Sequence, residues 1–315
     1  MFTGRRTRSL LVIGALGAVS LAGCGADGAG QTGAEQASPA VTGTTPAPVA
    51  GAVVTAQPGA SSGPAPGRGK FSRPADVSNR MFPLAPGTQF VYRGKVIEDG
   101  VSKPHSVVFT VTDLVKVVDG VLTVVAWDRD FLDARLQEQE LAFFAQDDAG
   151  NVWNFGEYPE EYENGKFAGA PSTWIKGTRG AYGGIHMLAR PRAGVRYSEG
   201  LVPAIDFDDV SMVVRTGQLT CAFSRCFRHV LVIDETSPND PASGHQIKYY
   251  APATGLIRVG ARGGDSREFL GLAAVRHLGR AALAGVRESV LSMDRRAYRV
   301  SQVYRVTRPA IRRGG

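Results

Sequence analysis

The cysteines are the residues in this sequence whose spacing most narrows their chemistry. Cys221 and Cys226 form a lone C-x4-C pair, which is poor evidence for a metal site. In an oxidising compartment such a pair favours a disulfide, and two free buried thiols are the alternative. On one straight strand the two residues would sit roughly 16 Å apart, so residues 222–225 must turn or bulge if the bond forms. The loop is short, and we expect a stabilisation of about 2 kcal/mol at most.

Acidic and histidine side chains could supply acid–base or metal chemistry, but their spacing does not support it. Glu157, Glu160, Glu161 and Glu163 could contain an acid/base pair, although they fit ordinary hairpin edges better. The segment 206–209 could offer oxygens to calcium, but it lacks the glycine and glutamate of a known loop and is expected to be a solvated acidic loop. The five histidines are scattered. With no nucleophile elbow, Walker loop or H-E-x-x-H motif either, we predict a non-catalytic protein without cofactor or metal.

The third cysteine, Cys24, ends the run Leu21-Ala22-Gly23-Cys24, which resembles the lipobox of bacterial lipoproteins. There the small residues let a peptidase approach the backbone, and the cysteine sulfur receives a diacylglycerol. Two acyl chains give stable anchoring where one would be marginal. The sequence therefore predicts lipidation at Cys24 and a membrane partner reached through that lipid.

The segments on either side of Cys24 agree with export. Arginines at 5, 6 and 8 precede an apolar run from Leu10 to Leu21 that is too short to span a bilayer comfortably. We predict a signal peptide over residues 1–23. Residues 24–75 are rich in Gly, Ala, Pro, Thr and Ser and cannot bury enough surface to offset their ordering entropy, so we expect a disordered, lipidated tether. The expected location is the extracytoplasmic face of the bacterial cell membrane; an ordinary secreted protein, or a single uncleaved anchor helix, is the alternative.

The formal net charge of +7 comes from the two ends of the chain. Arginines concentrate in the first eight residues and beyond residue 280, which leaves the middle close to neutral. A basic pI that reflects only the ends argues against a nucleic-acid-binding core, and we expect no nucleic-acid partner.

The middle of the chain must provide the scaffold, and its dominant hydrophobic period is two. Turn signals such as Asp119-Gly120 and Asn164-Gly165 separate the apolar runs. We predict a mainly β domain over residues 76–280, an antiparallel curved sheet or a partly closed barrel. The expected strands include residues 90–93, 107–112, 121–127, 135–144, 152–155, 211–215, 227–234, 246–250, 255–261 and 268–272.

Residues 281–315 change to a helical period. Apolar residues recur every three or four positions from Leu283 to Tyr304, and arginines occupy the other faces. We predict a basic amphipathic helix that packs its stripe on the sheet or on a neighbouring molecule; lying on anionic lipid or wall polymer, or forming a tail, are the alternatives. The residues expected to contact an anionic surface are Arg287, Arg295, Arg296, Arg299 and Arg305.

The segment Asn79–Thr88, followed by Tyr92, resembles the opening of an uncharacterised family of bacterial secreted proteins and lipoproteins, which read N-x-x-FPL-x-PGT-x-x-x-Y. Tyr249–Leu256 resembles its Y-Y-A-P-x-x-G-L segment, although Ala253 stands where the family usually has glycine. The resemblance covers residues 79–272. It implies a β-rich domain and brings no established activity or catalytic residues.

Two functional classes follow from this architecture. The first is a non-catalytic binding or carrier module whose concave sheet face holds an apolar or lipid ligand. The second is a cell-envelope interaction or assembly protein that acts through the arginine-rich helix on a partner such as an anionic envelope polymer. An unrecognised hydrolase is the third. A cleft with convergent carboxylates and a histidine would favour that third class.

Overall fold

The computed structural model describes residues 69–314. The expected signal peptide, the lipidation at Cys24 and most of the expected tether lie outside the described residues. The tether was expected to continue to residue 75, but its last residues pack on the domain. The Phe71 ring lies edge-on to Phe155 with 5.4 Å between centroids, and Ala75 is buried. The structured domain therefore extends further toward the N-terminus than the sequence predicted.

Nearly all of the regular structure is β. The strands are β1 (Thr88–Glu98), β2 (Val101–Val118), β3 (Val121–Leu132), β4 (Arg135–Gln146), β5 (Val152–Glu163), β6 (Lys166–Gly169), β7 (Trp174–Ile175), β8 (Tyr182–Gly183), β9 (Ile185–Met187), β10 (Arg196–Val202), β11 (Phe207–Ala222), β12 (Arg225–Thr236), β13 (His245–Ala251), β14 (Gly255–Arg262), β15 (Ser266–His277) and β16 (Ile311–Arg312). One α-helix, α1 (Arg280–Val300), and three short 3-10 helices, η1 (Pro203–Ile205), η2 (Pro241–Ser243) and η3 (Tyr304–Val306), complete the described part of the chain.

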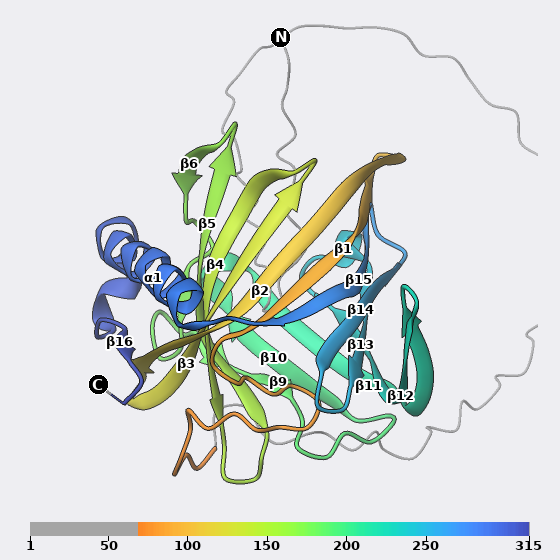
Figure 1. Ribbon diagram of the computed structural model, residues 1–315, viewed down its shortest axis with the longest axis horizontal. Coiled ribbons are helices and arrows are strands. Elements are labelled where there is room, and N and C mark those ends of the chain that lie inside the picture. The colour runs from red at the N-terminus through yellow and green to blue at the C-terminus, as the bar shows by residue number, and fades with distance from the viewer. Residues whose placement is uncertain (1–68, 315) are drawn as a thin grey trace, which may run out of the picture. The chain divides into compact units, whose positions relative to one another are not determined.

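The strands form one antiparallel sheet in the order β6-β5-β4-β3-β2-β1-β15-β14-β13-β12-β11-β10-β8. Every strand predicted from the period-two pattern lies within an observed strand, and the predicted mainly β fold is confirmed. The turns Asp119-Gly120 and Asn164-Gly165 both have positive φ at each residue, as a tight two-residue hairpin requires. Figure 1 shows the sheet curving strongly from β5 round to β12.

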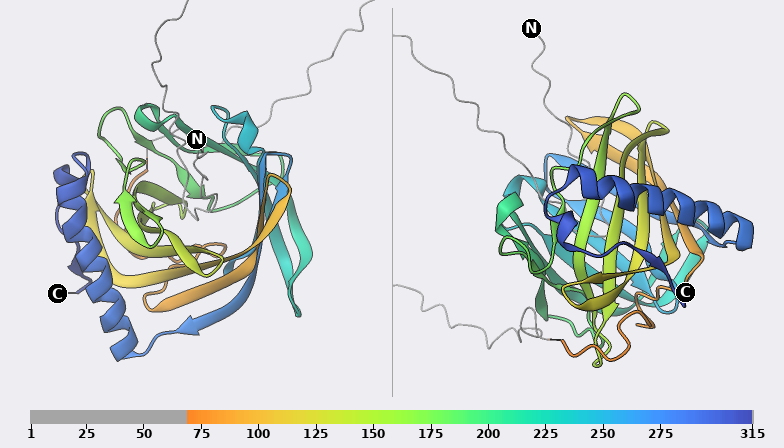
Figure 2. Two further views of the ribbon diagram at one scale, coloured as in Figure 1. Left: turned by 90° about the horizontal axis from the view of Figure 1, so that it is seen from above. Right: turned by 90° about the vertical axis from the view of Figure 1, so that its left-hand side faces the viewer.

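The sheet does not close into a barrel, but its two ends come near each other through a short segment. β8 pairs with β10, and β9 pairs with β5. Between β8 and β9, the carbonyl of Gly184 accepts a hydrogen bond from the amide of Asn154 at 2.9 Å. A Cβ at Gly184 would collide with the backbone at Glu199, so this approach requires glycine. The curved sheet thus surrounds an inner face (Figure 2).

The helix α1 covers the outer face of the sheet, where it contacts β2 and β4 (Figure 2). Val290, Met293 and Ala297 of its apolar stripe are buried, which confirms the predicted packing of the stripe on the sheet. The helix ends at Val300, earlier than the stripe suggested, and Tyr304 is buried from η3 instead. Within residues 69–314, no helix is long and apolar enough to cross a bilayer.

Candidate functional site

The inner face of β3 and β4 changes from apolar to acidic along the strands. Val124 and Ala126 lie opposite Phe144 and Ala142, and continuing toward the β3–β4 turn the same face carries four acids. Asp128 is directly opposite Glu140, and Asp130 is directly opposite Glu138. All four are buried, with exposed fractions of 2–6%. Like charges directly opposite each other destabilise a sheet, so packing alone does not account for this arrangement.

His105 on β2 lies between Asp130 on β3 and a further acid, Glu268, on β15. His105 Nε2 lies 2.8 Å from Asp130 Oδ1, and its Nδ1 lies 3.0 Å from Glu268 Oε1 on β15. Burial of the imidazole opposes its charge, but the bonds to the two carboxylates outweigh it and raise the pKa of His105 to about 10. His105 is therefore a cation at neutral pH. We call Asp128, Asp130, Glu138, Glu140 and Glu268 the acidic band.

Burial raises the pKa of each member of the acidic band. Asp128 reaches about 7, because burial and then the charge of Asp130 disfavour its ionised form. Glu268 also reaches about 7, with His105 opposing the effect of burial. Burial also raises the pKa values of Glu138 and Glu140 well above the ordinary range, and the charges of neighbouring acids raise them further. Near neutral pH the band carries much less charge than its composition suggests.

Several oxygens of the band meet no side-chain hydrogen-bond donor in good geometry within the described residues. They are both carboxylate oxygens of Asp128, Oδ2 of Asp130, Oε2 of Glu140 and Oε1 of Glu268. The backbone N–H of Arg129 nevertheless lowers the pKa of Asp128, and Glu268 lies in the ion pair with His105. An unsatisfied buried polar atom costs about 1–3 kcal/mol. Within residues 69–314, no three His, Cys, Asp or Glu side chains are arranged to hold a metal ion.

A second group of inward-facing charges lies on β10–β13, and its acids have partners. Lys248 Nζ donates to both oxygens of Glu235 at 2.7 Å. Ser211 donates to Glu199, and Ser237 donates to Asp209. Burial and then Glu199 raise the pKa of Glu235 to about 7, even though Lys248 opposes the rise. Lys248 is thus bonded to Glu235, and its charge also opposes the rise in the pKa of Glu268 in the acidic band.

Glu157 connects the acidic interior to a surface pocket. Its Oε2 accepts a hydrogen bond from the indole nitrogen of Trp174 at 2.9 Å, and its other oxygen accepts one from Asn154. Burial raises the pKa of Glu157 to about 8 despite these bonds. Trp174 stacks on Phe207 within a small separate core, with 5.8 Å between ring centroids, and one side of it lines the pocket.

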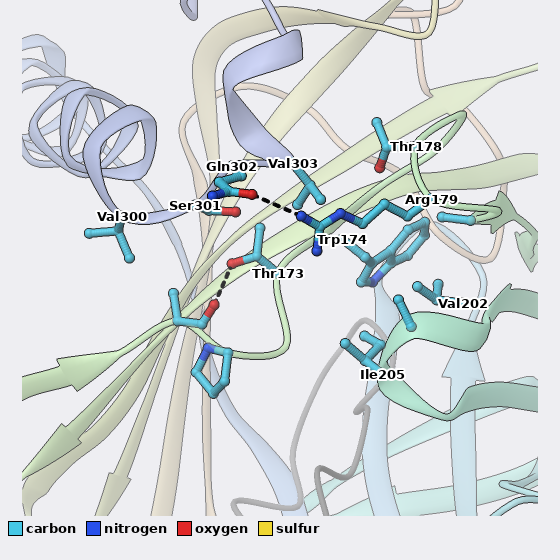
Figure 3. Close-up of a pocket in the computed structure, with 14 residues that line it drawn as sticks. Thr173, Trp174, Thr178, Arg179, Val202, Ile205, Val300, Ser301, Gln302 and Val303 are labelled. Atoms are coloured by element: carbon cyan, nitrogen blue, oxygen red, sulfur yellow. Dashed lines mark hydrogen bonds between the residues drawn. The ribbon is translucent and has the colours of Figure 1, made fainter.

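The pocket, which we call the Trp174 pocket, has a volume of about 340 Å³ (Figure 3). One wall comes from the segment before β8 and from η1, and the other comes from the end of α1 and the residues after it. The lining residues are Ala170, Pro171, Thr173, Trp174, Thr178, Arg179, Ala181, Val202, Ala204, Ile205, Val300, Ser301, Gln302 and Val303. Arg179 donates to the side-chain oxygen of Gln302 at 3.0 Å across the pocket.

Of the five arginines that were expected to contact an anionic surface, two are paired with acids of the sheet and three are exposed. Arg287 forms a bidentate ion pair with Asp113, and Arg296 forms one with Glu160. The shortest N···O distance is 2.5 Å in each pair. Both side chains therefore hold α1 on the sheet. Arg295, Arg299 and Arg305 are exposed. An anionic partner would reach these three most readily.

The cysteine pair forms the disulfide that the sequence favoured. Cys221 and Cys226 lie opposite each other in the β11–β12 ladder, and Phe223 and Ser224 make the turn that the bond requires. The ring of Phe223 lies exposed at this hairpin tip. The bond joins two strands and lies on neither the acidic band nor the Trp174 pocket.

Two of the acidic segments differ from their sequence-based interpretation. Glu157 and Glu160 are buried, whereas hairpin edges should be solvated. Asp209 is also buried, because residues 207–209 begin β11 and do not form a loop. The acidic band itself was missed. The signal was present in Asp128-x-Asp130 and Glu138-x-Glu140, since acids two apart in a strand share one face.

Comparisons with known proteins add little to this geometry. No family model matches the chain, and no curated protein matches it. A protein from Bacteroides fragilis NCTC 9343, provisionally described as exported and with a YmcC-like fold, shares 14% identity over 63% of this chain and 99% of its own, with a TM-score of 0.34. A protein from Parabacteroides distasonis ATCC 8503, provisionally described as a lipoprotein, shares 12% identity over 63% of this chain and 99% of its own, with a TM-score of 0.33. Likeness at this level says nothing about what this chain does.

Proposed function

We propose that this protein is a lipid-anchored, extracytoplasmic binding module that takes an anionic amphiphile in the Trp174 pocket. The address is supported by the signal-like N-terminus and the motif that ends at Cys24. The ligand class is supported by the pocket, whose lining is mostly polar and includes the guanidinium of Arg179, with apolar side chains from both walls beside these polar groups. That lining is the observation on which the proposal rests.

The apolar part of the lining suits a small hydrocarbon body. Val300 and Val303 expose carbon surface on one wall, and Trp174, Val202 and Ile205 contribute to the other wall while remaining almost fully buried (Figure 3). The volume of about 340 Å³ lies at the lower end of the range for small-molecule sites. A ligand with a short chain or a single ring would fill it and gain about 25 cal/mol for each Å² of apolar surface removed from water.

The polar part of the lining suits an anionic head. Arg179 uses one of its guanidinium nitrogens on Gln302 and keeps further N–H groups for a ligand. Of the described residues that line the pocket, none is Asp or Glu, and the exposed Arg299 and Arg305 flank the segment that forms one wall. A carboxylate or phosphate would therefore be attracted, and an ammonium group repelled.

From the sequence, we expected an apolar ligand on the concave face of the sheet. The acidic band occupies part of that inner face, and carboxylate oxygens without partners do not favour hydrocarbon. The Trp174 pocket lies instead between the end of α1 and the β7–β8 segment. The proposal keeps the binding role and changes both the place and the charge of the ligand.

The test is native mass spectrometry of the full chain with decanoate, decyl phosphate and the uncharged analogue decanol. We expect one equivalent of either anion to bind and decanol to bind at least tenfold more weakly. Ala204→Trp should block the pocket and abolish binding, and Arg179→Gln should remove the preference for charge. Ala273→Trp and Arg190→Gln, at exposed positions that do not line the pocket, are the matched controls. Equal binding of decanol and decanoate, unaffected by Ala204→Trp, would refute the proposal.

A second candidate is docking of the C-terminal segment on an anionic surface. Val306 and Ile311 are 68% and 55% exposed, and they lie among the exposed arginines 305, 308 and 312. Apolar side chains that insert between lipid heads, with arginines around them, suit a bilayer that contains anionic lipid. Co-sedimentation with phosphatidylglycerol vesicles, but not with phosphatidylcholine vesicles, would support this role. Binding that survives Val306→Ser and Ile311→Ser would count against it.

A further inference from the structure

The acidic band lacks the cation that its chemistry calls for. His105 lies between Asp130 and Glu268, at one end of the band. Asp128 and Glu140 lie further along the band, and His105 makes its ion pairs with Asp130 and Glu268 instead. Arg129 is next in the chain to Asp128, but successive side chains of a strand point to opposite faces, and its guanidinium stacks over the Trp127 ring at 4.2 Å. Lys248, the other inward-facing cation, is bonded to Glu235.

Asp128 is one sign that something binds here. It is 6% exposed, it faces inward beside Glu140, and neither of its carboxylate oxygens meets a side-chain donor within the described residues, although the backbone N–H of Arg129 lies close enough to lower its pKa. Asp130 and Glu140 each add one more oxygen of the same kind, and both are at least 96% buried. Buried polar groups in folded proteins nearly always have a partner. Several such acceptors on one face form a site for a compact donor.

We infer that the acidic band binds a primary ammonium group of a small organic cation, at a site separate from the Trp174 pocket. An ammonium carries three N–H donors and one positive charge, which matches acceptor oxygens from two adjacent strands. A metal ion fits less well, because the described residues hold no three ligating side chains in a suitable arrangement. An anionic or purely apolar ligand would leave the carboxylate oxygens without donors.

The band lies close to one end of the sheet, which gives a ligand a short route to it. Asp130 is two residues from the end of β3, Glu138 is three from the start of β4, and Glu268 is two from the start of β15. The turns that join these strands lie at the end of the sheet where β1–β5 extend furthest (Figure 1). Local opening of hairpin ends is the least costly motion available to such a sheet.

The chemistry of the site predicts proton release on binding. The acids of the band are partly protonated near neutral pH, and an ammonium favours their ionised forms. Each carboxyl group that ionises on binding gives its proton to the buffer. The ammonium keeps its own protons and donates hydrogen bonds to the carboxylates. No covalent bond is formed or broken.

The test is isothermal titration calorimetry of the full chain in nanodiscs of zwitterionic lipid, with putrescine as the probe and 1,4-butanediol as its uncharged analogue. We expect saturable binding of putrescine, none of butanediol, and an apparent enthalpy that changes with the ionisation enthalpy of the buffer. Asp128→Asn and Glu140→Gln should each weaken putrescine binding at least tenfold. Glu288→Gln, which removes an exposed acid from α1, is the control for surface charge and should leave binding unchanged.

Several outcomes would overturn the inference. They are no saturable binding of putrescine, binding that is equal in Glu288→Gln and Asp128→Asn, or calcium binding that excludes putrescine. Both band variants replace a group that is already partly neutral at neutral pH, so we expect them to fold, and thermal melts check this before titration. The result is independent of the decanoate experiment, because Arg179→Gln and Ala204→Trp do not touch the band.

Discussion

Asp128 sits on a face that is apolar only two residues earlier, at Ala126, and a buried aspartate at such a position needs a physical account. Burial and then the charge of Asp130 raise its pKa to about 7, well above the usual value for aspartate. The folded state therefore holds a proton that the unfolded chain releases near pH 4. A position like this lowers stability whenever the pH is high enough to ionise it.

Replacing Asp128 with asparagine should therefore stabilise the free protein at alkaline pH. The amide has nearly the same shape and no charge, and the pKa difference sets an upper limit of about 4 kcal/mol on the gain at pH 8. At pH 4, where the carboxyl is neutral in the folded state and only about half ionised in the unfolded chain, the gain should nearly vanish. Urea unfolding at the two pH values measures it. A gain of equal size at both would mean that ionisation of Asp128 is not the cause.

The elements themselves were largely predictable, because apolar runs and turn signals follow each other along the chain. Strands such as 121–127 and 227–234 are rich in apolar and β-branched residues, and Asn164-Gly165 is a typical hairpin turn. The short β7, β8 and β9 were missed because two or three residues carry no period. Gly156 allows the close approach of β7 to β5, and Gly183 and Gly184 allow that of β8 and the residue after it. The acidic band was missed because acids on a buried face look like solvated edges until the register is known.

The helix α1 is held to the sheet by a buried ion pair as well as by its apolar stripe. Lys116, whose side chain is fully buried on β2, donates to Asp294 at 2.8 Å and to the carbonyl of Arg308 at 2.7 Å. The hydroxyl of Tyr304 also donates to Asp294, at 2.7 Å. Burial lowers the pKa of Lys116, and the charge of Asp294 opposes this. This network joins the helix, the segment after it and the sheet.

Lys116→Met should destabilise the fold by about 3–5 kcal/mol, because it leaves the carboxylate of Asp294 buried without its cation. The double variant Lys116→Met with Asp294→Leu removes both charges and should recover much of that loss. Chemical unfolding of the three proteins forms the comparison, and limited proteolysis near residue 300 reports whether α1 detaches. A double variant no more stable than Lys116→Met would show that packing of the lysine stem dominates.

At the scale of the whole molecule, charge is separated by position. The net charge is +7, yet the inner face of the sheet carries the acidic band and the acids around Lys248, while arginines gather on the segment from α1 onward. Acids with raised pKa values concentrate on one side of the sheet and cations on the other. The two proposed ligands follow this division: an organic ammonium inside the sheet and an anionic amphiphile beside the arginine-rich segment.

The same division predicts an unusual dependence of stability on pH. Asp128, Glu235 and Glu268 have folded pKa values of about 7, and Glu157 of about 8, against about 4 in the unfolded chain. The folded state thus binds more protons than the unfolded state between about pH 4 and pH 8, and the stability that these groups contribute is lost as the pH rises through that window. His105, with a folded pKa of about 10, acts in the same direction above pH 6.5.

His186 acts in the opposite direction on the acid side. Burial lowers its pKa to about 3, so its contribution to stability is lost as the pH falls from about 6.5. One histidine against at least four acids leaves the acids dominant, and we expect the melting temperature of the free protein to be higher at about pH 5.5 than at about pH 8.5. Glu157→Gln should flatten the slope, whereas Glu288→Gln, on the surface, should not. A melting temperature that rises from pH 5.5 to 8.5 would contradict the ionisation assigned to the interior.

Putrescine added at pH 8.5 should raise the melting temperature of the wild-type chain. It should not raise that of Asp128→Asn or Glu140→Gln.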